Sequence, residues 1–182
     1  FLKGNPYDIW MVAWSFSNLG MIKESLTFFD CLNKNAERFV AAANRPEDIT
    51  QVAFAFLNLN SPFYEDYFYE VNERGRWIVE LGNTQEIARV ALAMSKLNVS
   101  CVTDIDKDTD TDTFFVALND KVNSDYLCKK GTPSEIATTA QAFATLGIST
   151  HGQFFKSLSE NYKHIIEGTK RDVCNTLWSF AA

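Results

Sequence analysis

The residues best suited to catalysis or metal binding are the two histidines, His151 and His164, and the four cysteines, Cys31, Cys101, Cys128 and Cys174. The cysteines form no C-x-x-C pair, so neither a tetrahedral zinc site nor a disulfide framework is indicated. Isolated thiols that pack as small apolar groups in a reducing compartment are the favoured interpretation. Catalysis requires a nucleophile, a base and a charge-stabilising group that converge, and these residues form no such set. Kinase motifs such as G-x-G-x-x-G are also missing from the sequence. We therefore expect no enzymatic activity, no cofactor, no metal and no small-molecule substrate.

A run of alternating acids invites a calcium-binding interpretation. Its members are Asp104, Asp106, Asp108, Asp110 and Asp112. An EF-hand loop needs Gly at its sixth position and Glu at its twelfth. A loop starting at Asp104 has Thr109 and Phe115 there, and one starting at Asp106 has Thr111 and Ala117. A solvated loop between helices is therefore favoured over a specific metal site.

The composition is that of an ordinary globular chain of 182 residues, with 46% hydrophobic and 22% charged residues. The chain contains 15 Phe against 8 Gly and 4 Pro, which favours packed helices over a turn-rich β fold. The purely apolar runs span only a few residues, so we expect no membrane insertion. No secretory signal is visible.

One short segment recurs five times, over 8–20, 48–60, 86–98, 135–147 and 172–182. Each copy begins with an acid, at Asp8, Asp48, Glu86, Glu135 and Asp172, which gives spacings of 40, 38, 49 and 37 residues. The fixed apolar positions lie 1, 4, 5, 8 and 11 residues after the acid. This spacing predicts one buried stripe on an α-helix in every copy.

The limits of these helices are also marked in the sequence. Capping residues stand three positions before the acid in four copies, as Asn5, Asn83, Thr132 and Thr169. The second copy departs, with Arg45 at that position. The residues expected to end the helices in the left-handed conformation are Gly20, Asn60, Asn98 and Gly147.

A second helix is predicted after each of the first four copies. Its marker is an aromatic pair, found at Phe28-Phe29, Tyr67-Phe68, Phe114-Phe115 and Phe154-Phe155. We therefore expect an all-α fold of stacked αα-hairpins, a solenoid of about four and a half repeats of roughly 38 residues. The predicted repeats span about 5–43, 44–81, 82–130 and 131–168, with a partial repeat at 169–182, in a single solenoid segment over 1–182. We expect this segment to belong to a longer chain, because the sequence stops within an apolar helical pattern.

The recurring unit resembles the octotricopeptide repeat. It is also similar to the helical repeats of RAP-domain and Fas-activated serine/threonine kinase-like proteins, although no RAP domain is present. The resemblance covers essentially the whole chain. It implies RNA binding in a mitochondrion, or alternatively in a chloroplast or other plastid. It also implies a place in a ribonucleoprotein such as the mitochondrial ribosome, or a role as an RNA-processing or translation factor, with organellar rRNA or mRNA and neighbouring proteins as partners.

The helical pattern predicts which side chains of the first helices face a partner. Positions 2, 3, 6, 9 and 10 after the acid lie opposite the apolar stripe. The predicted RNA-facing or partner-facing residues are Trp10, Met11, Thr50, Gln51, Arg89, Lys96, Thr138, Gln141 and Asn175. In RNA-reading repeats, such side chains meet base edges or stack on bases. For Trp14, Phe54, Leu92 and Trp178, burial between the two helix layers is the favoured prediction.

The charge balance keeps a second function open. The chain has 17 Lys and Arg against 23 Asp and Glu, a formal charge of −6 and a pI near 4.9, whereas phosphate-binding surfaces are usually basic. The alternative to RNA binding is therefore a protein–protein interaction scaffold, a subunit of an organellar complex without autonomous RNA binding. An apolar groove formed around Trp10, Met11 and Trp14 would suit a partner helix.

Overall fold

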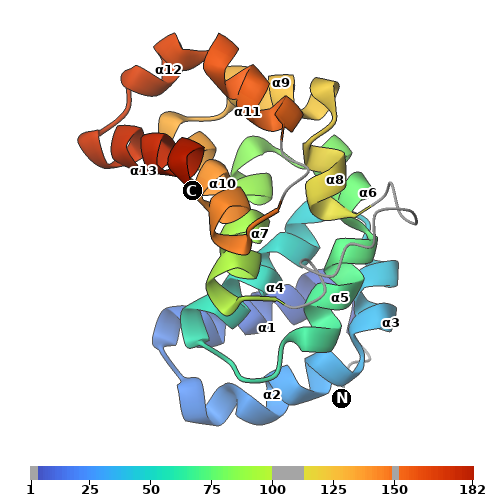
Figure 1. The fold of residues 1–182 in the computed structure, drawn as a ribbon. Coiled ribbons are helices and arrows are strands. Elements are labelled where there is room, and N and C mark those ends of the chain that lie inside the picture. The colour runs from blue at the N-terminus through green and yellow to red at the C-terminus, as the bar shows by residue number, and fades with distance from the viewer. Residues whose placement is uncertain (1–3, 100–112, 149–151) are drawn as a thin grey trace.

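The computed structural model describes residues 4–99, 113–148 and 152–182, and in these ranges the protein is all-helical without strands, as predicted (Figure 1). The helices, in chain order, are α1 (Pro6–Leu19), α2 (Ile22–Lys34), α3 (Ala36–Ala42), α4 (Pro46–Leu59), α5 (Glu65–Glu73), α6 (Gly75–Leu81), α7 (Thr84–Leu97), α8 (Phe114–Leu118), α9 (Lys121–Lys130), α10 (Pro133–Leu146), α11 (Gly152–Glu160), α12 (Tyr162–Ile166) and α13 (Lys170–Ala181). The acidic run at 104–112 lies outside the described residues.

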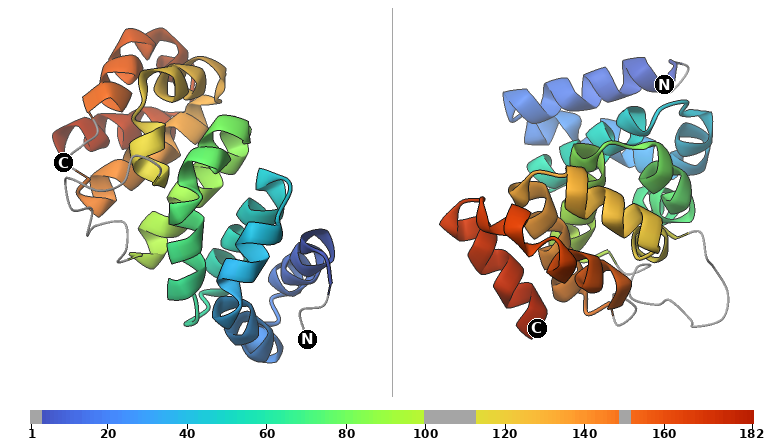
Figure 2. Two further views of the ribbon diagram at one scale, coloured as in Figure 1. Left: turned by 90° about the vertical axis from the view of Figure 1, so that its right-hand side faces the viewer. Right: turned by 90° about the horizontal axis from the view of Figure 1, so that it is seen from above.

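The five helices that begin at the recurring segments pack against one another in chain order. We call α1, α4, α7, α10 and α13 the A helices, and α1 contacts α4, α4 contacts α7, α7 contacts α10, and α10 contacts α13. The helices between them, which we call the B segments, form a second layer (Figures 1 and 2). Helix–helix packing of this kind is consistent with helical repeats. None of the described helices is long and apolar enough to cross a membrane.

The limits of the A helices follow from the residues identified in the sequence. Asn5, Asn83, Thr132 and Thr169 each accept a hydrogen bond from the backbone N–H of the acid three residues later. Arg45 at the start of α4 makes no side-chain cap. The four predicted end residues, Gly20, Asn60, Asn98 and Gly147, have positive φ angles of 47° to 63°. Both sets of predictions are confirmed.

Among the described residues each B segment contains two helices, and the prediction of a single second helix is wrong. The breaks fall at Asn35, Arg74, Asn119–Asp120 and Asn161. The amide groups of Asn35 and Asn161 donate to the carbonyl oxygens four residues earlier, at 2.8 and 2.7 Å. Asparagine side chains of this kind compete with the main chain for its hydrogen bonds, which favours a break in the helix.

Arg74 links the second B segment to the end of the first. Its guanidinium donates to the backbone carbonyls of Val40 and Ala43, at the C-terminus of α3. Its central carbon lies 3.9 Å from the ring centroid of Trp77. Burial lowers the pKa of Arg74. The carbonyl of Val40 also accepts a hydrogen bond from the backbone N–H of Ala43 at 3.3 Å. Arg74 adds donors at this helix end, where the carbonyls lack full pairing within the helix, and so joins two B segments.

Asparagine side chains also join successive B segments. In each of three pairs, the side-chain carbonyl of an asparagine accepts a hydrogen bond from a backbone N–H in the first turn of the next B segment. The pairs are Asn33 with Tyr67, Asn72 with Phe114, and Asn119 with Phe154, at 2.9, 3.3 and 2.9 Å. Each asparagine stands four residues after the aromatic pair of its own segment.

The aromatic pairs and the A helices together form the core. The residue eight positions after the acid contacts the first member of the pair that follows it, as Phe56 does with Tyr67 and Phe143 with Phe154, both at 4.9 Å between ring centroids. The same residue also contacts the second member of the preceding pair, as Phe56 does with Phe29 at 4.7 Å. The aromatic residues thereby connect an A helix to both of the adjacent B segments.

Candidate ligand-binding face of the A helices

The A helices have four sides, which the structure distinguishes by burial. Counting from the acid as position 0, successive residues turn by about 100° around the axis. Positions 1 and 8 face the B segments. Positions 0, 4, 7 and 11 form the N-side, which packs on the preceding A helix, and positions 2 and 5 form the C-side, which packs on the following one. Positions −1, 3, 6 and 10 remain on what we call the open face.

The first and last A helices reveal which neighbour each side meets. At position 4, Val52 and Val90 are fully buried, whereas Val12 of α1, which has no preceding A helix among the described residues, is 43% exposed. At position 5, Ala53 and Ala91 are fully buried, whereas Leu177 of α13 is 63% exposed. Position 4 therefore packs towards the preceding helix and position 5 towards the following one.

Seven of the nine predicted partner-facing residues lie on the open face. They are Met11, Gln51, Arg89 and Thr138 with Asn175 at position 3, Gln141 at position 6 and Lys96 at position 10. Lys96 is exposed and the other six are half-buried. The five residues at position 3 form one row across the A helices, so each helix contributes one side chain to it.

Thr50 and Trp10 do not belong to this face. Both stand at position 2, which points about 40° further towards the following A helix than position 6 does. Thr50 is fully buried, and its hydroxyl donates to the carbonyl of Glu47 at 3.4 Å. Trp10 is half-buried, its ring packs edge-on against Tyr7 at 5.3 Å, and its indole N–H is buried without a partner. The prediction that Thr50 faces a partner is therefore wrong.

The large side chains at position 6 are more exposed to solvent than predicted from the sequence. Trp14 and Trp178 are 46% and 49% exposed, and Phe54 and Leu92 are half-buried. The favoured prediction that they are buried between the layers is wrong, because position 6 lies about 40° from position 10 around the helix, on the open face and away from the B segments. The periodicity of the sequence could have placed them beside the polar row at position 3.

Direct contacts join side chains of the open face to the neighbouring A helix. The central carbon of the Arg89 guanidinium lies 5.2 Å from the ring centroid of Phe54, within the range of a cation–π interaction. The amide of Asn58 donates to the hydroxyl of Ser17 at 3.0 Å. Both contacts run between adjacent A helices. The first joins two open faces, and the second joins Asn58 on the open face of α4 to Ser17 at position 9 of α1, on its C-side.

The charge on this face differs from that of the whole chain. Its charged side chains at positions −1, 3, 6 and 10 are Arg89, Lys96, Arg171 and Glu47. Three of these are basic and one is acidic, although the chain carries a formal charge of −6. Most acids therefore lie elsewhere, some of them at helix N-termini. Glu86 closes a capping box, and burial raises its pKa.

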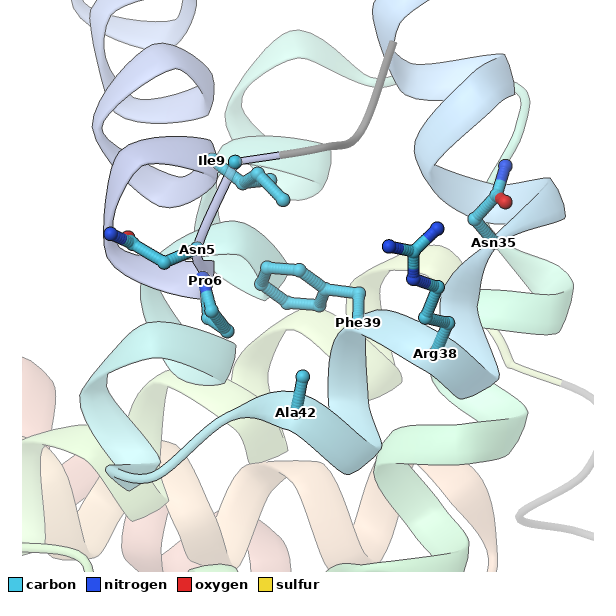
Figure 3. A pocket seen from close by; sticks show the side chains of 8 residues that line it. Asn5, Pro6, Ile9, Asn35, Arg38, Phe39 and Ala42 are labelled. Atoms are coloured by element: carbon cyan, nitrogen blue, oxygen red, sulfur yellow. The ribbon is translucent and has the colours of Figure 1, made fainter.

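Two hollows lie at the α1 end of the molecule. A cavity of about 170 Å³ is lined by residues of α1 and α3, among them Asn5, Ile9, Arg38 and Phe39 (Figure 3). A shallower apolar hollow of about 240 Å³ lies on α1 and the turn after it, lined by Met11, Val12, Ser15, Phe16, Leu19 and Met21. Within the described ranges, no group of three or more His, Cys, Asp or Glu residues is arranged to hold a metal ion.

No protein-family model matches the chain, and neither a curated protein nor a solved structure matches it.

Proposed function

We propose that the open face of the A helices binds single-stranded RNA. The observation that carries the proposal is the pairing of two rows across successive helices. The row at position 3 offers the polar groups of Gln51, Arg89, Thr138 and Asn175, and the row at position 6 includes the exposed rings of Trp14 and Trp178. Single-stranded RNA is recognised by such a combination, in which rings stack on bases and polar groups bond to base edges.

The local charge supports a polyanionic ligand. Arg89, Lys96 and Arg171 lie on the open face, and neutralising phosphates releases counterions, which supplies affinity. Because these cations are few, the salt dependence of binding should correspond to only a few phosphate contacts. The acidic remainder of the chain would oppose binding outside this face.

The proposal includes a solenoid architecture and an organellar location. In it, α1–α3, α4–α6, α7–α9 and α10–α12 are four αα-hairpin repeats, and α13 is the first helix of a fifth.

The resemblance to octotricopeptide-type repeats supports a mitochondrial ribonucleoprotein, with a plastid as the alternative. Fractionation of cells that express the full-length protein would test this location, and recovery in the cytosol alone would contradict it.

A protein-interaction scaffold is the second candidate function. It is favoured by the first repeat, where the open face is apolar, with Met11 and Trp14, and where Val12 and Leu19 are also exposed on the N-side. An apolar surface of this kind suits a partner helix better than RNA. The acidic net charge also favours a protein partner over RNA.

A titration of labelled single-stranded RNA of mixed sequence distinguishes the two functions. We expect binding at low salt that weakens as salt rises, and further weakening in Arg89→Ala and Lys96→Ala. The matched control is Lys156→Ala, which removes an exposed lysine from α11 in the B layer and should bind as the wild type does. An absence of binding at low salt would contradict RNA recognition by this face and would favour the function as a protein-interaction scaffold.

A further inference from the structure

Arg89 lies in the middle of the row at position 3. Its helix, α7, packs between α4 and α10, so A helices cover both of its flanks (Figure 1). The neighbours of Arg89 in the row are Gln51 on α4 and Thr138 on α10, and all three side chains are half-buried. Every other residue of the row is uncharged. Arg89 therefore places a cation among side chains that are suited to neutral hydrogen bonds.

The guanidinium of Arg89 has unused hydrogen-bond donors. Arg45 and Arg76 form ion pairs with carboxylates, and Arg74 donates to two backbone carbonyls. Arg89, by contrast, makes no hydrogen bond or ion pair with any residue in the part of the chain that the structure describes. The carboxylate of Glu86, one turn earlier on α7, belongs to the capping box. The planar guanidinium can therefore offer paired N–H groups to a ligand with two acceptors side by side.

The ring of Phe54 holds this guanidinium at the open face. Phe54 stands at position 6 of α4, and the central carbon of the Arg89 guanidinium lies 5.2 Å from its ring centroid. The contact is a cation–π interaction that crosses from one A helix to the next. A side chain held in this way loses less conformational freedom when it binds a ligand. The donors of Arg89 are thus partly ordered before any ligand arrives.

We propose that Arg89 recognises a guanine base through two hydrogen bonds, an inference that rests on the proposed binding of single-stranded RNA to the open face. Guanine carries two acceptors, O6 and N7, side by side on one edge. Adenine and uracil offer one acceptor each on that edge, and cytosine offers a donor. The edge is free to bond in single-stranded RNA. The paired donors of an arginine therefore match guanine better than any other base.

The surroundings of Arg89 favour a base over a phosphate group. Its neighbours in the row, Gln51 and Thr138, are uncharged hydrogen-bonding side chains, which suit base edges. Lys96, at position 10 of the same helix, is exposed. Its ammonium is a point charge on a flexible stem, which suits a phosphate. Helix α7 thus provides one group for a base and another for the backbone.

Binding of four uridine oligomers, followed by fluorescence anisotropy at low salt, tests this contact. One oligomer contains uridine alone, and the others carry a single guanosine, adenosine or 7-deazaguanosine. We expect the wild type to bind the guanosine oligomer at least about fivefold more tightly than the uridine and adenosine oligomers. The 7-deazaguanosine oligomer keeps O6 and the ring system but lacks the acceptor N7, so it should bind less tightly than the guanosine oligomer.

Arg89→Lys separates the base contact from the charge. It keeps the positive charge and loses the paired donors, so the preference for guanosine should be lost while binding to uridine alone is kept. Arg38→Lys is the matched control, because Arg38 is exposed on α3 in the B layer. It should keep the preference of the wild type.

The outcomes distinguish failure of this contact from failure of RNA binding. Wild-type binding without a preference for guanosine would overturn the guanine contact and leave RNA binding by the open face in place. A preference that survives in Arg89→Lys, or that is unchanged with 7-deazaguanosine, would also overturn it. An equal loss of affinity for all four oligomers in Arg89→Lys would replace it with a phosphate contact. An absence of binding to every oligomer would contradict the proposed function itself.

Discussion

The side-chain carbonyl of Asn119 accepts a hydrogen bond from the backbone N–H of Phe154 at 2.9 Å, although 35 residues separate them. The donor lies in the first turn of α11, where the N–H groups have no partner within the helix. Phe154 is fully buried, so water is a poor substitute for Asn119. One side chain of the third B segment therefore completes a helix of the fourth.

Asn119→Ala should destabilise the protein by about 1–3 kcal/mol, because it leaves a buried N–H without an acceptor. Urea unfolding followed by circular dichroism would measure the change. Asn18→Ala is the matched control, since Asn18 is exposed on α1 and its loss should have little effect. Equal stability of Asn119→Ala and the wild type would show that water replaces the asparagine.

Gly75→Ala should destabilise the protein through overpacking, by about 3 kcal/mol, the upper end of the usual range. A Cβ atom at Gly75 would lie 2.0 Å from the backbone nitrogen of Phe114 and 2.2 Å from its Cα, both of which are main-chain atoms. Gly152→Ala is the comparison, because a Cβ there would have no atom within 4 Å. It should unfold at the same or a slightly higher denaturant concentration than the wild type. A mild effect of Gly75→Ala would mean that α6 and α8 can move apart.

Gly147→Val should destabilise the protein by about 1–2 kcal/mol, and Gly147→Asn should destabilise it less. Gly147 ends α10 with φ = 63°, a left-handed conformation that is costly for branched side chains and tolerated by asparagine. Asn60 and Asn98 end α4 and α7 in the same way. A Cβ at Gly147 would meet no atom within 4 Å, so only the backbone conformation is tested. Equal effects of Val and Asn in thermal unfolding would contradict this explanation.

Alkaline pH should destabilise the protein through Cys128. Burial raises the pKa of this thiol from 9.0 to about 12, so the unfolded chain loses the proton more readily than the folded one. The stability is then fully present below pH 9 and falls as the pH rises towards about 12. Unfolding free energies measured across this range should fall less steeply in Cys128→Ala. Part of the slope should remain, because burial also raises the pKa of Tyr67. An unchanged slope in Cys128→Ala would rule out this contribution.

The signals that located the A helices were local. Asn83, Thr132 and Thr169 form capping boxes within three residues of the helix start, and Gly20 and Asn60 adopt left-handed conformations through their own backbone preferences. Such effects depend on neighbours in the chain, so the sequence was sufficient to identify them. The break in each B segment was missed. At Asn35 and Asn161 the break has a local cause, a side chain that bonds to the carbonyl four residues earlier. Arg74 instead donates to a backbone carbonyl more than 30 residues away in the sequence.

By itself, the sequence determined the all-helical class, the spacing of the five A helices and most of the row at position 3. These features follow from a period of 3.6 residues and from short-range hydrogen bonds. The tertiary structure decided which flank of each A helix meets its neighbour, and it thereby buried Thr50 and exposed Trp14. The sequence could not decide this, because positions 2 and 6 differ by only about 40° around the helix and only the direction of stacking separates a packed side from an open one.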